Sequence, residues 1–161
     1  DIIIERGTHE RGMGWHLDGH DDGYRLLGTP IPLLQLKVGY YLTDMSAPDQ
    51  GNLCVIPASH KADLHADAED LQARELFDGA TQVCAPAGTA ILFHNALWHS
   101  AGPLAREDGG RVIAYYAYEH PWMIASAEHW GYSQEFYNAL DADQRSFFHG
   151  FVFDPPEHRW G

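Results

Sequence analysis

The residues of this sequence best suited to chemistry are the histidine and aspartate of the segment His16-Leu17-Asp18. Successive side chains of a β-strand point to opposite faces, so His16 and Asp18 would project from one face of a strand toward the same point. An imidazole and a carboxylate placed in this way supply two of the three ligands of a 2-His-1-carboxylate site, which binds Fe(II) and keeps coordination positions open. Without further context such a pair is more often a hydrogen-bonded surface pair, so a metal site requires another histidine from a distant strand.

Residues 88–103 contain two candidates for this third ligand, His94 and His99, which follow an apolar strand-like run. Their position alone does not separate them. We favour His99 because it stands next to Trp98, precedes a Gly-Pro turn and is followed by Arg111 at the head of the next strand-like run. An arginine there could reach the pocket and bind a carboxylate through two parallel hydrogen bonds. His94 is interpreted as a residue that supports the site or the core.

Further polar residues accompany these candidates. His20 lies on the same predicted face as His16, and we interpret it as a residue that supports the site or contacts solvent. Along the predicted strand 33–42, Gln35, Lys37 and Tyr41 form a polar-leaning face, which could be the pocket side of a sheet that encloses a site.

The elements that must position these residues are mainly strands. Residues 63–77 are rich in Ala, Glu and Leu, which predicts a helix carried on a strand-connecting loop. Ser133 can cap a helix that runs to Leu140, and Asp141 can cap another that stops at Gly150. These elements predict an all-β core, a sandwich or jelly roll, with helical additions that are mainly C-terminal. Short apolar or alternating runs separated by Gly and Pro turns are the predicted strands, namely residues 2–4, 14–18, 33–42, 53–56, 82–85, 90–93 and 112–118.

Composition restricts the class of protein. The 161 residues are enough for one domain with a core, and 10 Lys and Arg against 23 Asp and Glu give a net charge of −13. Such a field repels phosphate backbones and anionic lipid surfaces, so we expect neither a nucleic acid nor a membrane as partner. No apolar run approaches the roughly 20 residues that span a bilayer. Cys54 and Cys84 lack CxxC spacing, and we interpret both as buried reduced thiols of a soluble, cytoplasmic protein.

Three motifs in this order resemble the phytanoyl-CoA dioxygenase (PhyH) family of Fe(II)- and 2-oxoglutarate-dependent oxygenases: His16-x-Asp18, the stretch Gly51-Asn-Leu-Cys-Val-Ile-Pro-Ala-Ser-His60, and His99-x-x-Gly-Pro followed by Arg111. The resemblance covers roughly residues 12–118. It implies a double-stranded β-helix, which is a cupin-like jelly roll. It also implies that residues 1–161 are a single oxygenase domain, without an N-terminal region that is usual in the family.

The resemblance also implies the roles of the site residues. His16, Asp18 and His99 would be the metal ligands and the catalytic centre, and Arg111 would bind the far carboxylate of 2-oxoglutarate. The implied activity is a dioxygenase that uses Fe(II), 2-oxoglutarate and O2 to hydroxylate a small-molecule substrate, with release of succinate and CO2. Asp18 favours hydroxylation over halogenation, because halogenating relatives replace this carboxylate with a small residue.

Two other classes remain open from the residues themselves. One is a Zn-dependent hydrolase that would use His16, Asp18, His20 and another histidine. The other is a non-catalytic jelly-roll binding module that has kept its ligands by descent.

Overall fold

The computed structural model describes residues 2–5, 14–19, 24–64, 76–105, 110–120, 131–148 and 151–153. The chain divides into two compact units, Asp1–Glu119 and His120–Gly161, and each is described by itself. None of the helices in these ranges has the length and apolar character that crossing a bilayer requires.

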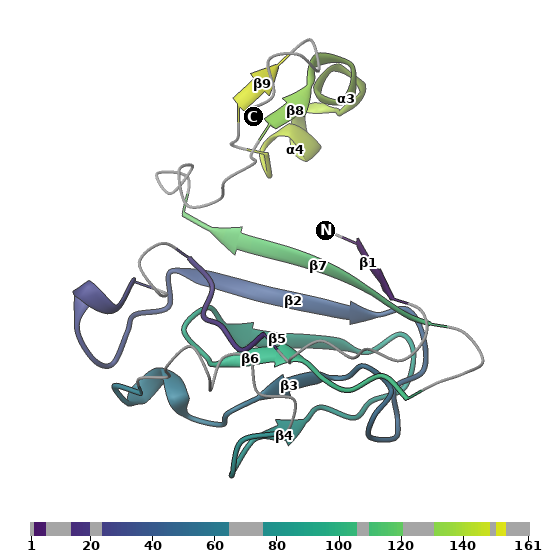
Figure 1. Cartoon of the computed structure of the whole chain (residues 1–161). Coiled ribbons are helices and arrows are strands. Elements are labelled where there is room, and N and C mark those ends of the chain that lie inside the picture. The colour runs from purple at the N-terminus through teal and green to yellow at the C-terminus, as the bar shows by residue number, and fades with distance from the viewer. Residues whose placement is uncertain are drawn as a thin grey trace. The chain divides into compact units, whose positions relative to one another are not determined.

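The first unit contains a four-stranded antiparallel sheet with the strand order β1-β7-β2-β5 (Figure 1). Its strands are β1 (Ile2–Glu5), β2 (Gln35–Tyr41), β5 (Ala90–His94) and β7 (Arg111–Glu119). The β-branched and aromatic residues that fill these segments favour a pleated, half-buried surface. In the pairing register, Lys37 of β2 lies opposite Phe93 of β5 and Ala117 of β7. β2 is therefore an interior strand with partners on both sides.

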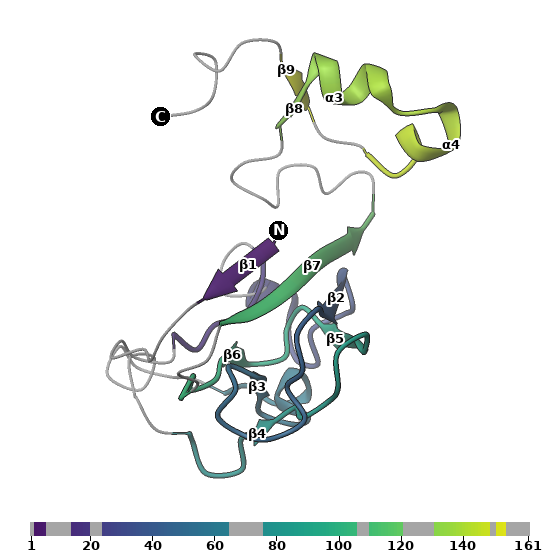
Figure 2. The same cartoon turned by 90° about the vertical axis from the view of Figure 1, so that its right-hand side faces the viewer.

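A smaller antiparallel sheet, with the order β4-β3-β6, faces the larger one (Figures 1 and 2). Its strands are β3 (Leu53–Val55), β4 (Thr81–Gln82) and β6 (His99–Ala101). Side chains from both sheets and from a connecting loop meet in one core cluster, which consists of Tyr41, Met45, Leu53, Phe93 and Ile113. Two sheets that share one core make a sandwich, and the predicted jelly-roll core is confirmed.

Short helical segments complete the described part of the chain. The first unit has two 3-10 turns, η1 (Arg25–Leu27) and η2 (Ser59–Lys61). In the second unit, β8 (Gly131–Ser133) pairs in parallel with β9 (Phe151–Phe153). The helices α3 (Gln134–Ala139) and α4 (Ala142–Arg145) lie between these two strands in the sequence.

Several local predictions can be compared with these elements. The caps at Ser133 and Asp141 are confirmed, since each side chain accepts a hydrogen bond from a backbone N–H of its helix. The second of these helices ends at Arg145, before the Gly150 that was predicted to stop it. The parallel β8-β9 pair was not predicted, because the residues of one short strand do not indicate which distant strand it pairs with. Residues 65–75, most of the predicted helix 63–77, lie outside the described residues.

Two predictions from the sequence were wrong. Residues 14–18 do not form a strand; they make one isolated antiparallel bridge, His16 with His99, because the chain bends at Asp18 and does not continue the ladder. Cys54 is buried and Cys84 is exposed, although both are free thiols. Val83 and Ala85 pack against the core, so the alternation of an extended chain turns Cys84 outward.

Candidate metal centre

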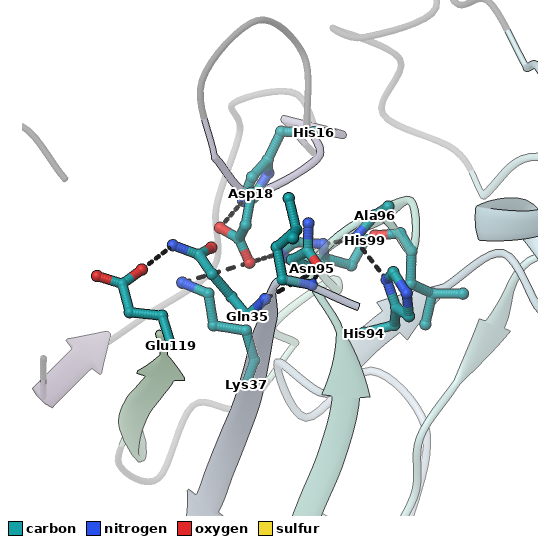
Figure 3. Close-up of polar contacts among 11 residues, drawn as sticks. His16, Asp18, Gln35, Lys37, His94, Asn95, Ala96, His99 and Glu119 are labelled. Atoms are coloured by element: carbon teal, nitrogen blue, oxygen red, sulfur yellow. Dashed lines mark hydrogen bonds and ion pairs between the residues drawn. The ribbon is translucent and has the colours of Figure 1, made fainter. Parts of the chain in front are cut away.

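Backbone pairing brings the metal-binding candidates together. His16 and His99 exchange two backbone hydrogen bonds of 3.0 and 3.1 Å, and the N–H of Asp18 donates to the carbonyl of Asn95 at 3.0 Å. These bonds hold the segment with His16 and Asp18 beside the end of β5 and the start of β6. His16, Asp18 and His99 each offer one ligand atom, and these atoms all lie within 4.8 Å of one another (Figure 3).

The side-chain geometry at this point suits a metal ion. Nε2 of His99 lies 3.3 Å from Oδ2 of Asp18, and Nε2 of His16 lies 4.0 Å from Oδ1 of the same carboxylate. Ligand atoms that sit about 2 Å from a metal are about 3 Å apart at neighbouring coordination positions. The 3.3 Å distance between His99 and Asp18 is close to this spacing, whereas the 4.0 Å distance between His16 and Asp18 would have to shorten by about 1 Å for all three to share one ion.

Both imidazoles are held in the tautomer that metal binding needs. Nδ1 of His16 lies 2.8 Å from the carbonyl oxygen of Gly14, and Nδ1 of His99 lies 2.8 Å from that of Leu97. A carbonyl oxygen only accepts, so each Nδ1 carries the proton and donates it to the backbone. The lone pair of each Nε2 is consequently available on the side of Asp18.

Burial also sets the charge of His99. It lowers the pKa of the His99 imidazole to about 4, while the Asp18 carboxylate opposes this shift. His99 is therefore neutral near pH 7, which is the form that binds a metal. His16 is the exposed member of the group, with Asp18 between the two histidines in exposure.

Arg111 lies at the start of β7 and is buried. Its guanidinium donates to the carbonyl of Gly51 at 2.6 Å, and a side chain at position 51 would collide with Cδ of Arg111. The positive charge also acts on Tyr41 and Cys54, whose pKa values burial raises and Arg111 lowers. Arg111 thus places a buried cation inside the sandwich, near the turn at Gly51.

His94 and His20 were the other histidines considered from the sequence. His94 pairs with Leu36 in the sheet, which turns its side chain away from the face that carries Lys37. Its ring stacks on His60, with centroids 4.8 Å apart, and its Nδ1 accepts the N–H of Ala96 at 3.0 Å. Of the two candidates, the structure brings His99 and not His94 to His16 and Asp18. His20 lies outside the described residues.

Other residues at the site complete a polar network (Figure 3). Asn95 is fully buried, and its Oδ1 accepts the backbone N–H groups of Leu34 and Gln35. The amide of Gln35 donates to Glu119, and Nζ of Lys37 lies 3.4 Å from Oδ2 of Asp18. The polar-leaning face of the predicted strand 33–42 had indicated Gln35 and Lys37. No sequence signal indicated Asn95, which only follows a strand.

A comparison with protein families finds one match over most of the first unit. The family model for phytanoyl-CoA dioxygenase (PhyH) matches residues 6–108. A search of curated proteins finds no match.

Solved structures with the same fold cover much of this chain. A non-heme monooxygenase, the ThoJ-Ni complex, is 25% identical, with a TM-score of 0.51 over 75% of this chain and 42% of its own. HygX from Streptomyces hygroscopicus with nickel, 2-oxoglutarate and hygromycin B bound is 19% identical, with a TM-score of 0.54 over 96% of this chain and 62% of its own. EvdMO1 is 21% identical, with a TM-score of 0.54 over 74% of this chain and 26% of its own. This chain therefore spans less than two thirds of the length of these proteins.

Proposed function

This chain belongs to the phytanoyl-CoA dioxygenase family, and on that premise we propose that it is an Fe(II)- and 2-oxoglutarate-dependent dioxygenase that hydroxylates a small-molecule substrate. The reaction would release succinate and CO2. The observation that supports this most is the convergence of His16, Asp18 and His99, with both imidazole Nε2 lone pairs available beside one carboxylate. Three protein ligands leave coordination positions for a cosubstrate and oxygen.

In this proposal each site residue has a defined task. His16, Asp18 and His99 hold Fe(II), and the backbone carbonyls at Gly14 and Leu97 keep the two rings oriented. Fe(II) with 2-oxoglutarate supplies the oxygen activation that hydroxylation requires. Support from solved structures is that ThoJ is described with nickel and HygX with nickel and 2-oxoglutarate.

Arg111 is proposed to bind the far carboxylate of 2-oxoglutarate. It is a buried cation, and carboxylates are bound well by guanidinium groups inside proteins. A guanidinium carries five N–H donors, so the bond to Gly51 is compatible with a two-bond pair to a carboxylate. The bond to Gly51 would then keep the guanidinium oriented before the cosubstrate arrives.

Anaerobic titration tests the proposal directly. Adding Fe(II) and then 2-oxoglutarate should produce a weak visible charge-transfer band, and admitting oxygen should produce succinate. Asp18→Asn keeps the size of the side chain but removes the negative charge, so we expect it to weaken Fe(II) binding and reduce succinate formation at least about tenfold. Mass spectrometry should then detect substrates that gain one oxygen atom.

Three results would contradict the proposal. A protein that binds metal but gives no 2-oxoglutarate-dependent band would fit a hydrolase instead. A protein that binds neither would fit a binding module. An Asp18→Asn variant with wild-type turnover would move the metal site elsewhere.

A further inference from the structure

Lys37 places a positive charge beside the candidate metal ligands. Its Nζ lies 3.4 Å from Oδ2 of Asp18, the same oxygen that lies 3.3 Å from Nε2 of His99. Figure 3 shows Lys37 and Asp18 directed at each other, with His99 beside them. The ammonium group is therefore within reach of the position that a bound metal would occupy.

The strand pairing explains why Lys37 points into the sandwich. On β2, side chains alternate between faces, and Lys37 shares its face with Gln35 and Tyr41, both of which are buried. Its side chain is 22% exposed, so it is not an ordinary solvated surface lysine. Its cross-strand neighbours are Ala117 of β7 and Phe93 of β5, neither of which carries a charge.

The positive charges of a bound metal and of Lys37 would favour the binding of a further anion at this position. A divalent metal held by Asp18 would repel an ammonium group at this distance, because both are positive and partly removed from water. Asp18 brings one negative charge, which would be shared between the metal and Lys37. The other acidic residue of this network, Glu119, accepts a hydrogen bond from Gln35. An anionic ligand that lies against both the metal and Lys37 would remove the repulsion.

We propose that Lys37 is a carboxylate-binding residue that receives the metal-side carboxylate of a 2-oxo acid. This proposal rests on the proposed function, because the 2-oxo acid reaches this position only as a metal ligand. Lys37 and Arg111 would then bind different carboxylates of 2-oxoglutarate. Lys37 would bind the carboxylate next to the oxo group, and Arg111 would bind the far one. Lys37 would also orient the cosubstrate relative to Asp18.

Binding measurements with two 2-oxo acids test this assignment without turnover. 2-Oxoglutarate has both carboxylates, whereas pyruvate has only the one next to the oxo group. Each is titrated anaerobically into the Fe(II)-loaded protein, and binding is followed by the charge-transfer band and by calorimetry. Fe(II) affinity is measured separately. The variants are Lys37→Met, which keeps the length without the charge, Lys37→Arg, which keeps the charge, and the matched control Lys61→Met on the exposed η2 turn.

We expect Lys37→Met to weaken both acids by a similar factor of about tenfold or more, because one charge-assisted bond is lost in each case. Fe(II) affinity should be unchanged or higher, since a nearby positive charge has been removed. Lys37→Arg should retain most of the affinity, and Lys61→Met should behave as wild type.

Other outcomes overturn the assignment. If only 2-oxoglutarate is weakened, Lys37 binds the far carboxylate. If neither acid is weakened, Lys37 serves Asp18 alone. If Fe(II) affinity falls as much as the affinity for the acids, Lys37 positions the Asp18 ligand. If Lys37→Met does not fold, as judged by circular dichroism, weakening of both acids in Lys37→Gln decides the question. Wild-type protein that binds neither acid would remove the proposed function as well, which separates the two failures.

Discussion

At the scale of single residues, His99 combines a polar function with a buried position. Its ring contacts Phe93 edge to face, with centroids 5.0 Å apart, and its Nδ1 donates a hydrogen bond to the backbone carbonyl of Leu97. Burial disfavours the protonated ring, which is why its pKa falls to about 4. His99 is thus kept neutral by the fold rather than by the metal.

The lowered pKa of His99 predicts a pH-dependent stability of the metal-free protein. The unfolded chain binds a proton on His99 near pH 6.5, but the folded chain does so only near pH 4. Protonation therefore favours unfolding, and stability should fall as the pH decreases from 6.5 toward 4. Between pH 7 and pH 5, His99 should account for about 2 kcal/mol of lost stability. Urea unfolding in the presence of a chelator measures this loss.

His99→Asn is the control for that measurement, because carboxylates also titrate in this range. The variant should lose less stability than the wild type over the same pH interval, although it is less stable at pH 7. Parallel stability curves for the two proteins would show that the His99 proton does not contribute.

At the scale of elements, the two faces of β2 carry different kinds of residues: one face is directed at the candidate metal centre and the other at the outer surface. Its inner face carries Gln35, Lys37 and Tyr41, while Tyr40 points to the other side of the sheet. On that outer side Tyr40 meets Tyr116 of β7 edge to face, and Leu92 of β5 is 60% exposed. The alternation of one interior strand therefore assigns neighbouring residues to the site and to the outer surface.

A pair of alanine substitutions in the large sheet should show the difference between its faces. Ile113 of β7 is fully buried, so Ile113→Ala should cost about 2–5 kcal/mol of unfolding free energy. Leu92→Ala removes a side chain that is mostly exposed, and should cost less than about 1 kcal/mol. Chemical denaturation of both variants provides the measurement. Equal losses would mean that Leu92 is covered in the folded protein.

At the scale of the whole molecule, the sequence predicts a single oxygenase domain over residues 1–161, while the chain divides into units at Glu119. We propose that the two units behave as one domain. Calorimetry should then show one unfolding transition, with equal calorimetric and van't Hoff enthalpies. Two resolved transitions would establish independent domains.

Metal binding should stabilise the molecule as a whole. Mn(II) added without 2-oxoglutarate should raise the melting temperature, and no reaction can start under these conditions. A ligand at about 100 times its dissociation constant adds about 2.7 kcal/mol to the free energy of unfolding. A chelator should reverse the effect. Asp18→Asn should lose most of the shift, and an equal shift in both proteins would place the bound Mn(II) away from Asp18.

The sequence by itself determined the features that depend on neighbouring residues. Alternation along an extended segment predicted a common point for His16 and Asp18, although that segment does not form a strand, and it placed Lys37 on the polar-leaning face of its own strand. The caps at Ser133 and Asp141 were also predictable, because a cap involves only the first turn of its helix.

Only the tertiary structure decided which distant residues meet. Position in the sequence does not separate His94 from His99, although the residues around His99 favoured it. The pairing of β5 and β6 with other strands turns His94 away and brings His99 to Asp18. The same pairing lets the backbone carbonyl of Asn95 accept the N–H of Asp18 and brings the ammonium group of Lys37 to the Asp18 carboxylate. The physical reason is that side-chain direction follows from local backbone geometry, whereas strand register follows from how the whole core packs.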